Sequence, residues 1–127
     1  MGLDRKVTIP AGIVPTWGPL ADFFTTRQFP VKIMMIDGEL SFPDELPPAT
    51  WRELRLGTPL GMVTLRREED GVRVVTWGNA EGPLLLAWNA ATLALAEVFG
   101  DRIHEGGEAR SAQEFARQVE LPEGWKA

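Results

Sequence analysis

Residues 83–99, PLLLAWNAATLALAEVF, constrain the fold of this chain more than any other segment. Pro83 suits the first turn of a helix, where its missing N–H has no intrahelical partner to lose. We therefore predict a helix over 83–99 that ends at Gly100, with the glycine acting as a left-handed C-cap. One stripe of this helix carries only apolar side chains, namely Leu84, Ala87, Trp88, Ala91, Leu95 and Val98.

The opposite side of the same helix is also apolar, because Leu86, Ala90 and Leu93 point away from that stripe. The polar residues of the helix are Asn89, Thr92 and Glu97. A helix that is apolar almost all round is buried on more than one side. We expect the second side to be covered either by an N-terminal helix or by a second copy of the chain, since such a strip is rarely exposed on a monomer. Leu86 and Leu93 are therefore candidate interaction residues.

The loop GNAEG, residues 78–82, precedes this helix at a position where phosphate-binding loops occur. It matches neither the dinucleotide-binding nor the P-loop glycine pattern. Glu81 would repel a phosphate, whereas it complements the positive end of the helix dipole. We interpret the loop as a structural turn and expect no cofactor.

Alternating apolar and polar residues predict strands in much of the remaining chain. We predict a strand at 5–9 and hairpins at 31–42 and 61–77. The first hairpin contains Asp37-Gly38, a pair that suits the two left-handed positions of a type I′ turn.

The segment WRELRL, residues 51–56, fits two structures. Thr50 and Glu53 have the spacing of a helical capping box. The alternation of Leu54 and Leu56 with charged residues indicates a strand instead. We favour the strand.

Two further helices are predicted from apolar spacing and capping signals. The first begins near Trp17 and is ended by Pro30, which excludes the helical conformation for the residue before it. Residues 102–110 read as a short strand and turn. Ser111 and Glu114 then form a capping box that opens a short helix through residue 119.

These elements predict a single α+β domain in a chain of 127 residues. We expect an antiparallel sheet of about five strands that packs one face against two helices, with a short C-terminal helix after them. The tail, residues 121–127, is expected to be loosely held, with Trp125 the residue best suited to fold back.

Composition excludes several classes of site. The chain has no cysteine, so it contains neither disulfides nor thiolate metal sites. Its net charge is −5 and its arginines are scattered among acidic residues, which argues against a nucleic-acid partner. The N-terminal residues lack the apolar run of a signal peptide, and no apolar stretch is long enough to span a bilayer. We expect a cytoplasmic protein without a membrane partner.

An acidic group follows the first predicted hairpin turn and consists of Asp37, Glu39, Asp44 and Glu45. The spacing of an EF-hand is absent, so we expect no metal. Prolines hold this segment extended at the surface, either as a solvated face or as an anionic docking surface for a basic protein. Trp51 follows these prolines, and we expect it to be the most exposed of the five tryptophans.

His104 is the only histidine and the one candidate for a general base. Its neighbours, Glu105 and two glycines, favour a surface turn. No G-x-S-x-G nucleophile motif is present. A small enzyme or ligand-binding domain that uses His104 in a cleft between sheet and helices is the alternative to a binding module.

The stretch VTIPAGIVPTW, together with the Ala/Leu-rich helix followed by RIHEGGEARSAQEFARQ, resembles small stand-alone bacterial α+β proteins of uncharacterised families. Some of these are encoded near toxin and immunity genes. The resemblance implies a non-enzymatic, partner-binding role and supplies no catalytic residue. We therefore expect an interaction protein, such as an immunity-like one, that binds another protein or a second copy of itself.

Overall fold

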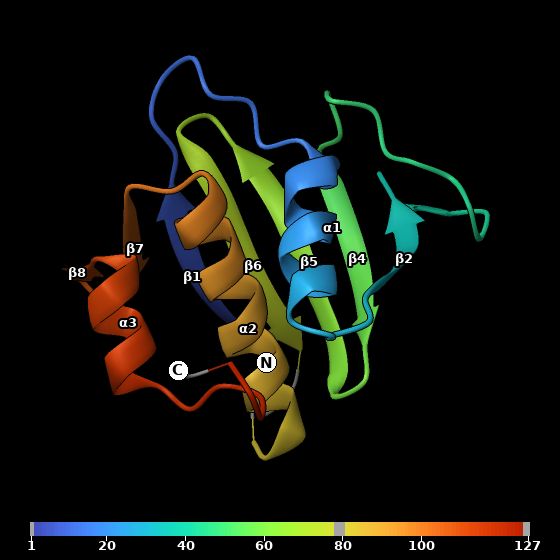
Figure 1. Cartoon of the computed structure of the whole chain (residues 1–127). Helices are drawn as coiled ribbons and strands as arrows, with labels where there is room; N and C mark the ends of the chain where they lie inside the picture. Colours follow the sequence, from blue (N-terminus) through green and yellow to red (C-terminus); the bar gives the residue numbers. More distant parts are fainter. Residues whose placement is uncertain (1, 78–80, 126–127) are drawn as a thin grey trace.

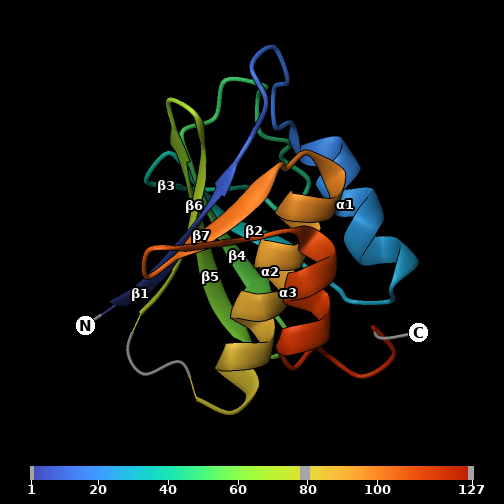
Figure 2. The same cartoon turned by 90° about the vertical axis from the view of Figure 1, so that its left-hand side faces the viewer.

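The computed structural model describes residues 2–77 and 81–125. The elements follow in the order β1 (Gly2–Thr8), α1 (Trp17–Thr26), β2 (Lys32–Ile36), β3 (Glu39–Leu40), β4 (Glu53–Thr58), β5 (Gly61–Glu68), β6 (Gly71–Trp77), α2 (Pro83–Val98), β7 (Arg102–Glu105), β8 (Glu108–Arg110) and α3 (Ala112–Gln118). The strands form one antiparallel sheet in the order β3-β2-β4-β5-β6-β1-β7-β8 (Figure 1). The helices cover one face of this sheet and leave the other face open (Figure 2).

The predicted α+β class with an antiparallel sheet is confirmed, but the sheet has 8 strands rather than about five. The outermost strands, β3 and β8, contain 2 and 3 residues. Strand β3 lies within the hairpin predicted at 31–42, whereas β8 has too few residues for an alternating pattern to be recognised. The ambiguous segment around residue 53 forms strand β4, so the helical alternative for it is wrong.

Strand β1 lies in the middle of the sheet, between β6 and β7. Val7 pairs with Val72 on one side and with Ile103 on the other, and all three side chains are fully buried under the helices. Successive side chains of a strand point to opposite faces. Lys6 and its cross-strand partner His104 therefore point to the open face.

Helix α2 is buried on two sides, as its composition predicts. On the sheet side, Trp88 Nε1 donates a hydrogen bond to the carbonyl of Val74 at 3.0 Å. On the other side, Ala90 is fully buried and Leu93 is only 4% exposed. The candidate interaction residue Leu93 is therefore a core residue, and Leu86 is half-buried.

The cover over this second side comes from the chain itself. Helix α1 packs along α2, and the segment after α3 reaches the front of the N-terminal half of α2 (Figure 1). Asn89 Nδ2 donates to the carbonyl of Glu120 at 2.7 Å, which fastens that segment to α2. The ring of Trp125 then packs against Phe24 and Phe29, with centroids 6.3 and 5.4 Å away. The expectation of a loosely held tail is wrong through residue 125, whereas the expectation that Trp125 folds back is confirmed. No second copy is needed to cover Leu93.

Of three structures predicted from local sequence signals, two are confirmed and one is wrong. Asp37 and Gly38 have φ values of 50° and 85°, which confirms the type I′ turn. Both hydrogen bonds of the capping box at Ser111 and Glu114 are present. Gly100 is not left-handed, so that prediction is wrong. A Cβ at this position would lie 2.7 Å from the Cα of Ala96, so the glycine is required for close packing instead.

Candidate interaction surface

The hairpin of β2 and β3 projects at one edge of the sheet, and Asp37 holds it in place. One carboxylate oxygen of Asp37 accepts the backbone N–H groups of Arg52 and Glu53, at 2.7 and 2.9 Å. These two hydrogen bonds lower the pKa of Asp37, because they favour the charged form. Asp37 therefore anchors the hairpin turn to β4, although the residue is exposed.

The loop after β3, residues 41–50, has a defined shape that local hydrogen bonds maintain. Ser41 Oγ donates to the carbonyl of Ile33 at 2.6 Å. Glu45 accepts the backbone N–H of Phe42 at 3.0 Å, and Arg67 Nη1 donates to the carbonyl of Ala49 at 2.7 Å. The loop therefore presents its side chains from a structured backbone.

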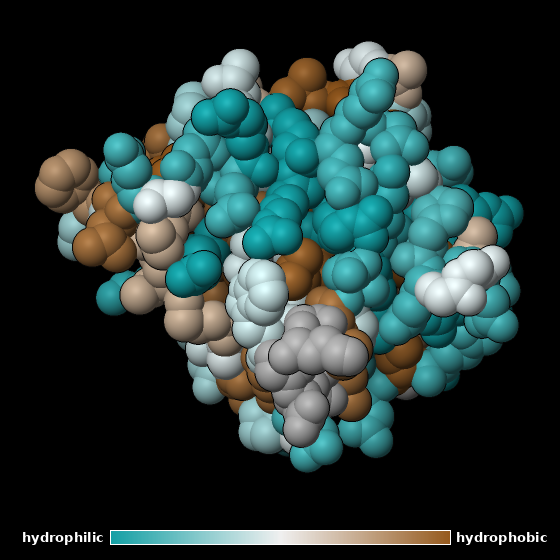
Figure 3. All heavy atoms as spheres, turned by 180° about the vertical axis from the view of Figure 1, so that it is seen from behind, coloured by the Kyte–Doolittle hydropathy of each residue, from teal (hydrophilic) through white to brown (hydrophobic). Residues whose placement is uncertain are grey.

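Three large apolar side chains of this region point into solvent. Leu40, Phe42 and Leu46 are 81%, 73% and 78% exposed. Glu39 and Asp44 lie among them, are also exposed, and make no hydrogen bond or ion pair with the side chains that the structure describes. We refer to these five residues as the hairpin-loop patch. Figure 3 shows the apolar side chains gathered at this edge of the sheet, on the left of that view.

Trp51 is not exposed, contrary to the sequence-based prediction. Its side chain is fully buried, its Nε1 donates to the carbonyl of Pro15 at 2.9 Å, and the guanidinium of Arg67 lies 4.5 Å from its ring centroid. The turn that follows Pro47 and Pro48 directs the indole inward, where it joins the loop before α1 to the sheet. Trp51 is thus a core residue and no part of the interaction surface.

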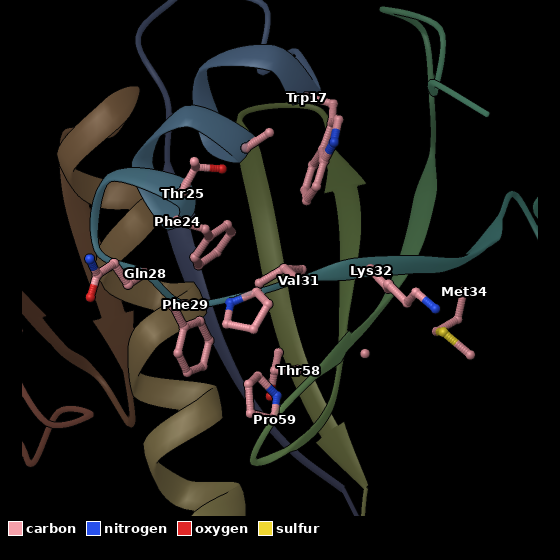
Figure 4. Close-up of a pocket in the computed structure, with 13 residues that line it drawn as sticks. Trp17, Phe24, Thr25, Gln28, Phe29, Val31, Lys32, Met34, Thr58 and Pro59 are labelled. Atoms are coloured by element: carbon pink, nitrogen blue, oxygen red, sulfur yellow. The ribbon is translucent and has the colours of Figure 1, made fainter. Parts of the chain in front are cut away.

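An apolar cleft of about 780 Å³ lies at the same edge of the sheet, between α1 and the strands β2 and β4 (Figure 4). Its wall on the α1 side is formed by Trp17, Phe24 and Phe29. Met34, on β2, lines its other end and is 40% exposed. Sequence patterning predicted Trp17 and Phe24 as core residues, but it gave no sign that a cleft borders them.

His104 lies on β7 and its side chain is exposed on the open face of the sheet. Its Nε2 is 3.5 Å from Thr8 Oγ1, and it borders a shallow hollow that Lys6, Asp70 and Arg73 also line. The helices pack on the other face, so the predicted position of His104 in a cleft between sheet and helices is wrong.

The charged side chains around this hollow form ion pairs with one another. Arg73 forms two hydrogen bonds with the Glu68 carboxylate, at 2.8 and 3.2 Å, and a third with Asp4 at 2.6 Å. These contacts raise the pKa of Arg73 and lower the pKa of Glu68. Lys6 forms ion pairs with Glu68 and Asp70. The open face is hydrophilic (Figure 3), and these two cations and three carboxylates around the hollow are all held in ion pairs.

A buried polar network was missed in the sequence. Arg5 is 5% exposed, and its Nη1 donates to Asn89 Oδ1 at 2.7 Å while its Nε donates to Glu105 Oε1 at 3.0 Å. Its guanidinium lies 3.6 Å from the centroid of Trp88, and Arg110 bonds to the same carboxylate oxygen of Glu105 at 2.8 Å. Asn89, one of three polar residues in an otherwise apolar helix, is the signal that indicates such a partner. Each of these charged or amide side chains is hydrogen-bonded to another member of the network, which joins β1, β7, β8 and α2.

Two further findings concern metal ligands and membrane-spanning helices. In residues 2–77 and 81–125, no three His, Asp or Glu side chains are placed to hold a metal ion. None of the helices in the same part of the chain is both long and apolar enough to cross a bilayer. The loop interpreted as a turn before α2 includes residues 78–80, which lie outside the described part. Glu81 is exposed, and Gly82 has a φ of 56°.

No protein-family model, curated protein or solved structure matches this chain. The likeness to bacterial families near toxin and immunity genes therefore rests on sequence pattern alone, and function must be argued from the surface.

Proposed function

We propose that this protein is a non-enzymatic interaction module that binds another protein through the hairpin-loop patch. The observation that carries the proposal is the exposure of Leu40, Phe42 and Leu46, each above 70%, on a loop with a defined backbone. Large apolar side chains that gather at the surface commonly mark protein interaction sites. Phe42 is the candidate anchor, since aromatic residues dominate the binding energy of most interfaces.

The charges of the patch define the partner's chemistry. Glu39 and Asp44 are exposed beside the apolar residues, whereas the acids of the open face are paired with Arg and Lys. A matching partner surface would be apolar at its centre and basic at its rim, because complementary charge speeds association and excludes wrong partners. In its specific form, the proposal is an immunity-like role in the cytoplasm, with a basic target protein.

The test is site-specific photo-crosslinking in cells, with a photoreactive phenylalanine at position 42 and, as a control, at position 14. Val14 is also an exposed apolar residue, at 51%, but it lies in the loop before α1. The crosslinked protein is identified, purified and titrated against wild type, Phe42→Ser and Val14→Ser. We expect Phe42→Ser to weaken binding about tenfold or more, as loss of an aromatic anchor does, and Val14→Ser to have no effect. Equal affinity for all three proteins would refute the proposal, and crosslinking to a second copy would replace the foreign partner with a dimer.

The alternative, a small enzyme or ligand-binding domain that uses His104, draws less support from the structure. Within the described residues, the exposed His104 side chain makes one hydrogen-bond contact, with Thr8 Oγ1 at 3.5 Å, and no carboxylate or carbonyl group orients its ring for proton transfer. Its surroundings are a solvated ion-pair network, where water screens the charges that catalysis would use.

A further inference from the structure

The apolar cleft between α1 and β2 is separate from the hairpin-loop patch and has its own chemistry. Trp17, Phe24 and Phe29 form a continuous aromatic wall, since the ring centroids of Trp17 and Phe24 are 6.4 Å apart and those of Phe24 and Phe29 are 6.0 Å apart. Trp125 packs against the outer side of Phe24 and Phe29. The wall is thus supported from behind and preformed, as ligand sites usually are.

The volume of this cleft, about 780 Å³, lies in the range of small-molecule sites. Its lining is mostly apolar, with Val31 and Pro59 facing the aromatic wall. Figure 4 shows Phe24 and Phe29 at one end and the side chains of Lys32 and Met34 at the other. A ligand that spans the cleft would therefore lay an apolar body on the rings and bring its far end to Lys32.

The polar groups of the lining favour a ligand that carries negative charge. Lys32 is the one charged residue in the lining of this cleft, and it forms no ion pair within the described part of the chain, although the whole protein has a net charge of −5. The indole N–H of Trp17 also lacks a hydrogen-bond partner among the described residues, whereas those of Trp51 and Trp88 donate to carbonyl groups. The lining therefore offers an ammonium and an N–H donor, and no carboxylate that would repel an anion.

We propose that this cleft binds a small amphipathic carboxylate, with the apolar body on Trp17, Phe24 and Phe29 and the carboxylate at Lys32. Trp17, Phe24 and Phe29 are only 8%, 3% and 6% exposed. Most of the apolar surface that a ligand would bury therefore comes from the rest of the lining, such as Val31, Met34 and Pro59. The ion pair with Lys32 selects a carboxylate over a neutral or cationic head group. This site is independent of the proposed protein partner, since no residue of the hairpin-loop patch lines the cleft.

The test is calorimetric titration of the whole protein with decanoate, 1-decanol and decylamine, each below its aggregation concentration. We expect saturable binding of one decanoate per chain, weaker binding of decanol and none of decylamine. Lys32→Gln should weaken decanoate binding about fivefold, the upper end for an exposed ion pair, and leave decanol unchanged. The result that overturns the carboxylate assignment is equal binding of all three probes, or an unchanged decanoate affinity in Lys32→Gln.

Two variants at neighbouring positions test whether the ligand binds in the cleft. Thr25 lines the cleft and Thr26 does not, and both are exposed on α1, so a tryptophan at either position should leave the fold intact. Thr25→Trp should fill the cleft and abolish decanoate binding, whereas Thr26→Trp should bind as wild type does. If the two variants bind decanoate equally, or if wild type shows no saturable binding, the cleft is not the site and the proposal is wrong. Phe42→Ser should retain decanoate binding. The proposal for the cleft can therefore fail or succeed independently of the proposal for protein binding.

Discussion

Replacement of Trp88 tests the central claim about α2, that its stripe of apolar residues meets the sheet. Trp88 is 3% exposed, donates one hydrogen bond to the carbonyl of Val74, and supports the guanidinium of Arg5 on its ring. Trp88→Ala removes all three contributions and leaves a cavity at the centre of the molecule. The same change beneath Arg5 also weakens the network that joins β1 to α2.

The expected loss of unfolding free energy follows from these contacts. Truncation of a buried aromatic residue to alanine costs about 3–5 kcal/mol. Within that range the lost hydrogen bond accounts for about 1 kcal/mol, and the lost cation–π contact at a desolvated site for up to about 2 kcal/mol. We therefore expect a loss near the upper end for Trp88→Ala. Trp88→Phe keeps a ring but loses the N–H donor, so its cost should be about 1–2 kcal/mol.

The assay is unfolding in guanidinium chloride followed by far-ultraviolet circular dichroism, which does not depend on the fluorescence of the removed indole. Trp77→Ala is the matched control, since Trp77 is 54% exposed at the end of β6. Its cost should stay below about 1 kcal/mol, as for most surface substitutions. A loss below about 1 kcal/mol for Trp88→Ala would refute the assignment of the buried face, because no core aromatic is so dispensable.

Three further variants test other parts of the argument. Leu93→Glu should unfold the protein, with a loss of about 3 kcal/mol or more, because Leu93 is buried and a carboxylate there would be desolvated. Circular dichroism and light scattering that show a folded monomer would instead indicate an interface between copies. Ser111→Ala should cost about 1 kcal/mol through the lost N-cap, and should lower hydrogen-exchange protection across α3. Asp37→Asn should destabilise at neutral pH, since the depressed pKa of Asp37 means that its carboxylate contributes stability above the unfolded-state pKa. That contribution is lost as the pH falls through the folded-state pKa, so the wild-type and Asp37→Asn unfolding curves should converge in acid; a difference that is the same at all pH values would contradict this role.

The features that were predictable from sequence are those that neighbouring residues determine. The turn at Asp37, the capping box at Ser111 and the burial of α2 each depend on side chains within a few positions of one another. Gly100 shows where such reasoning fails. Its place after a helix fits a left-handed cap, but its actual constraint is the approach of Val7 and Ala96, and Val7 is distant in sequence.

The candidate surface was predictable only in part, for the same physical reason. The acidic residues of the loop were identified from their charge, and Glu39 and Asp44 are indeed exposed. The apolar members of the patch were missed, because hydrophobicity alone predicts burial. Whether Phe42 is buried or exposed depends on the absence of any layer over the β2–β3 edge, and that is a property of the tertiary structure. For Trp51 the error is the reverse, because it was predicted to be exposed and is buried. Its burial depends on the carbonyl of Pro15 and the guanidinium of Arg67, which are distant in sequence.

The distribution of paired and unpaired groups decides where a partner would gain most by binding. On the open face, a partner that contacts Arg73 would compete with Glu68 and Asp4, which already hold its guanidinium. Such contacts replace one solvated ion pair with another and contribute little. At the β2–β3 edge, a partner that covers Phe42 and Leu46 displaces water from apolar surface and breaks no internal contact of those side chains, which makes burial there favourable by about 25 cal/mol for each Å². We therefore expect Phe42→Ser to have the same free energy of unfolding as wild type but to bind the partner more weakly.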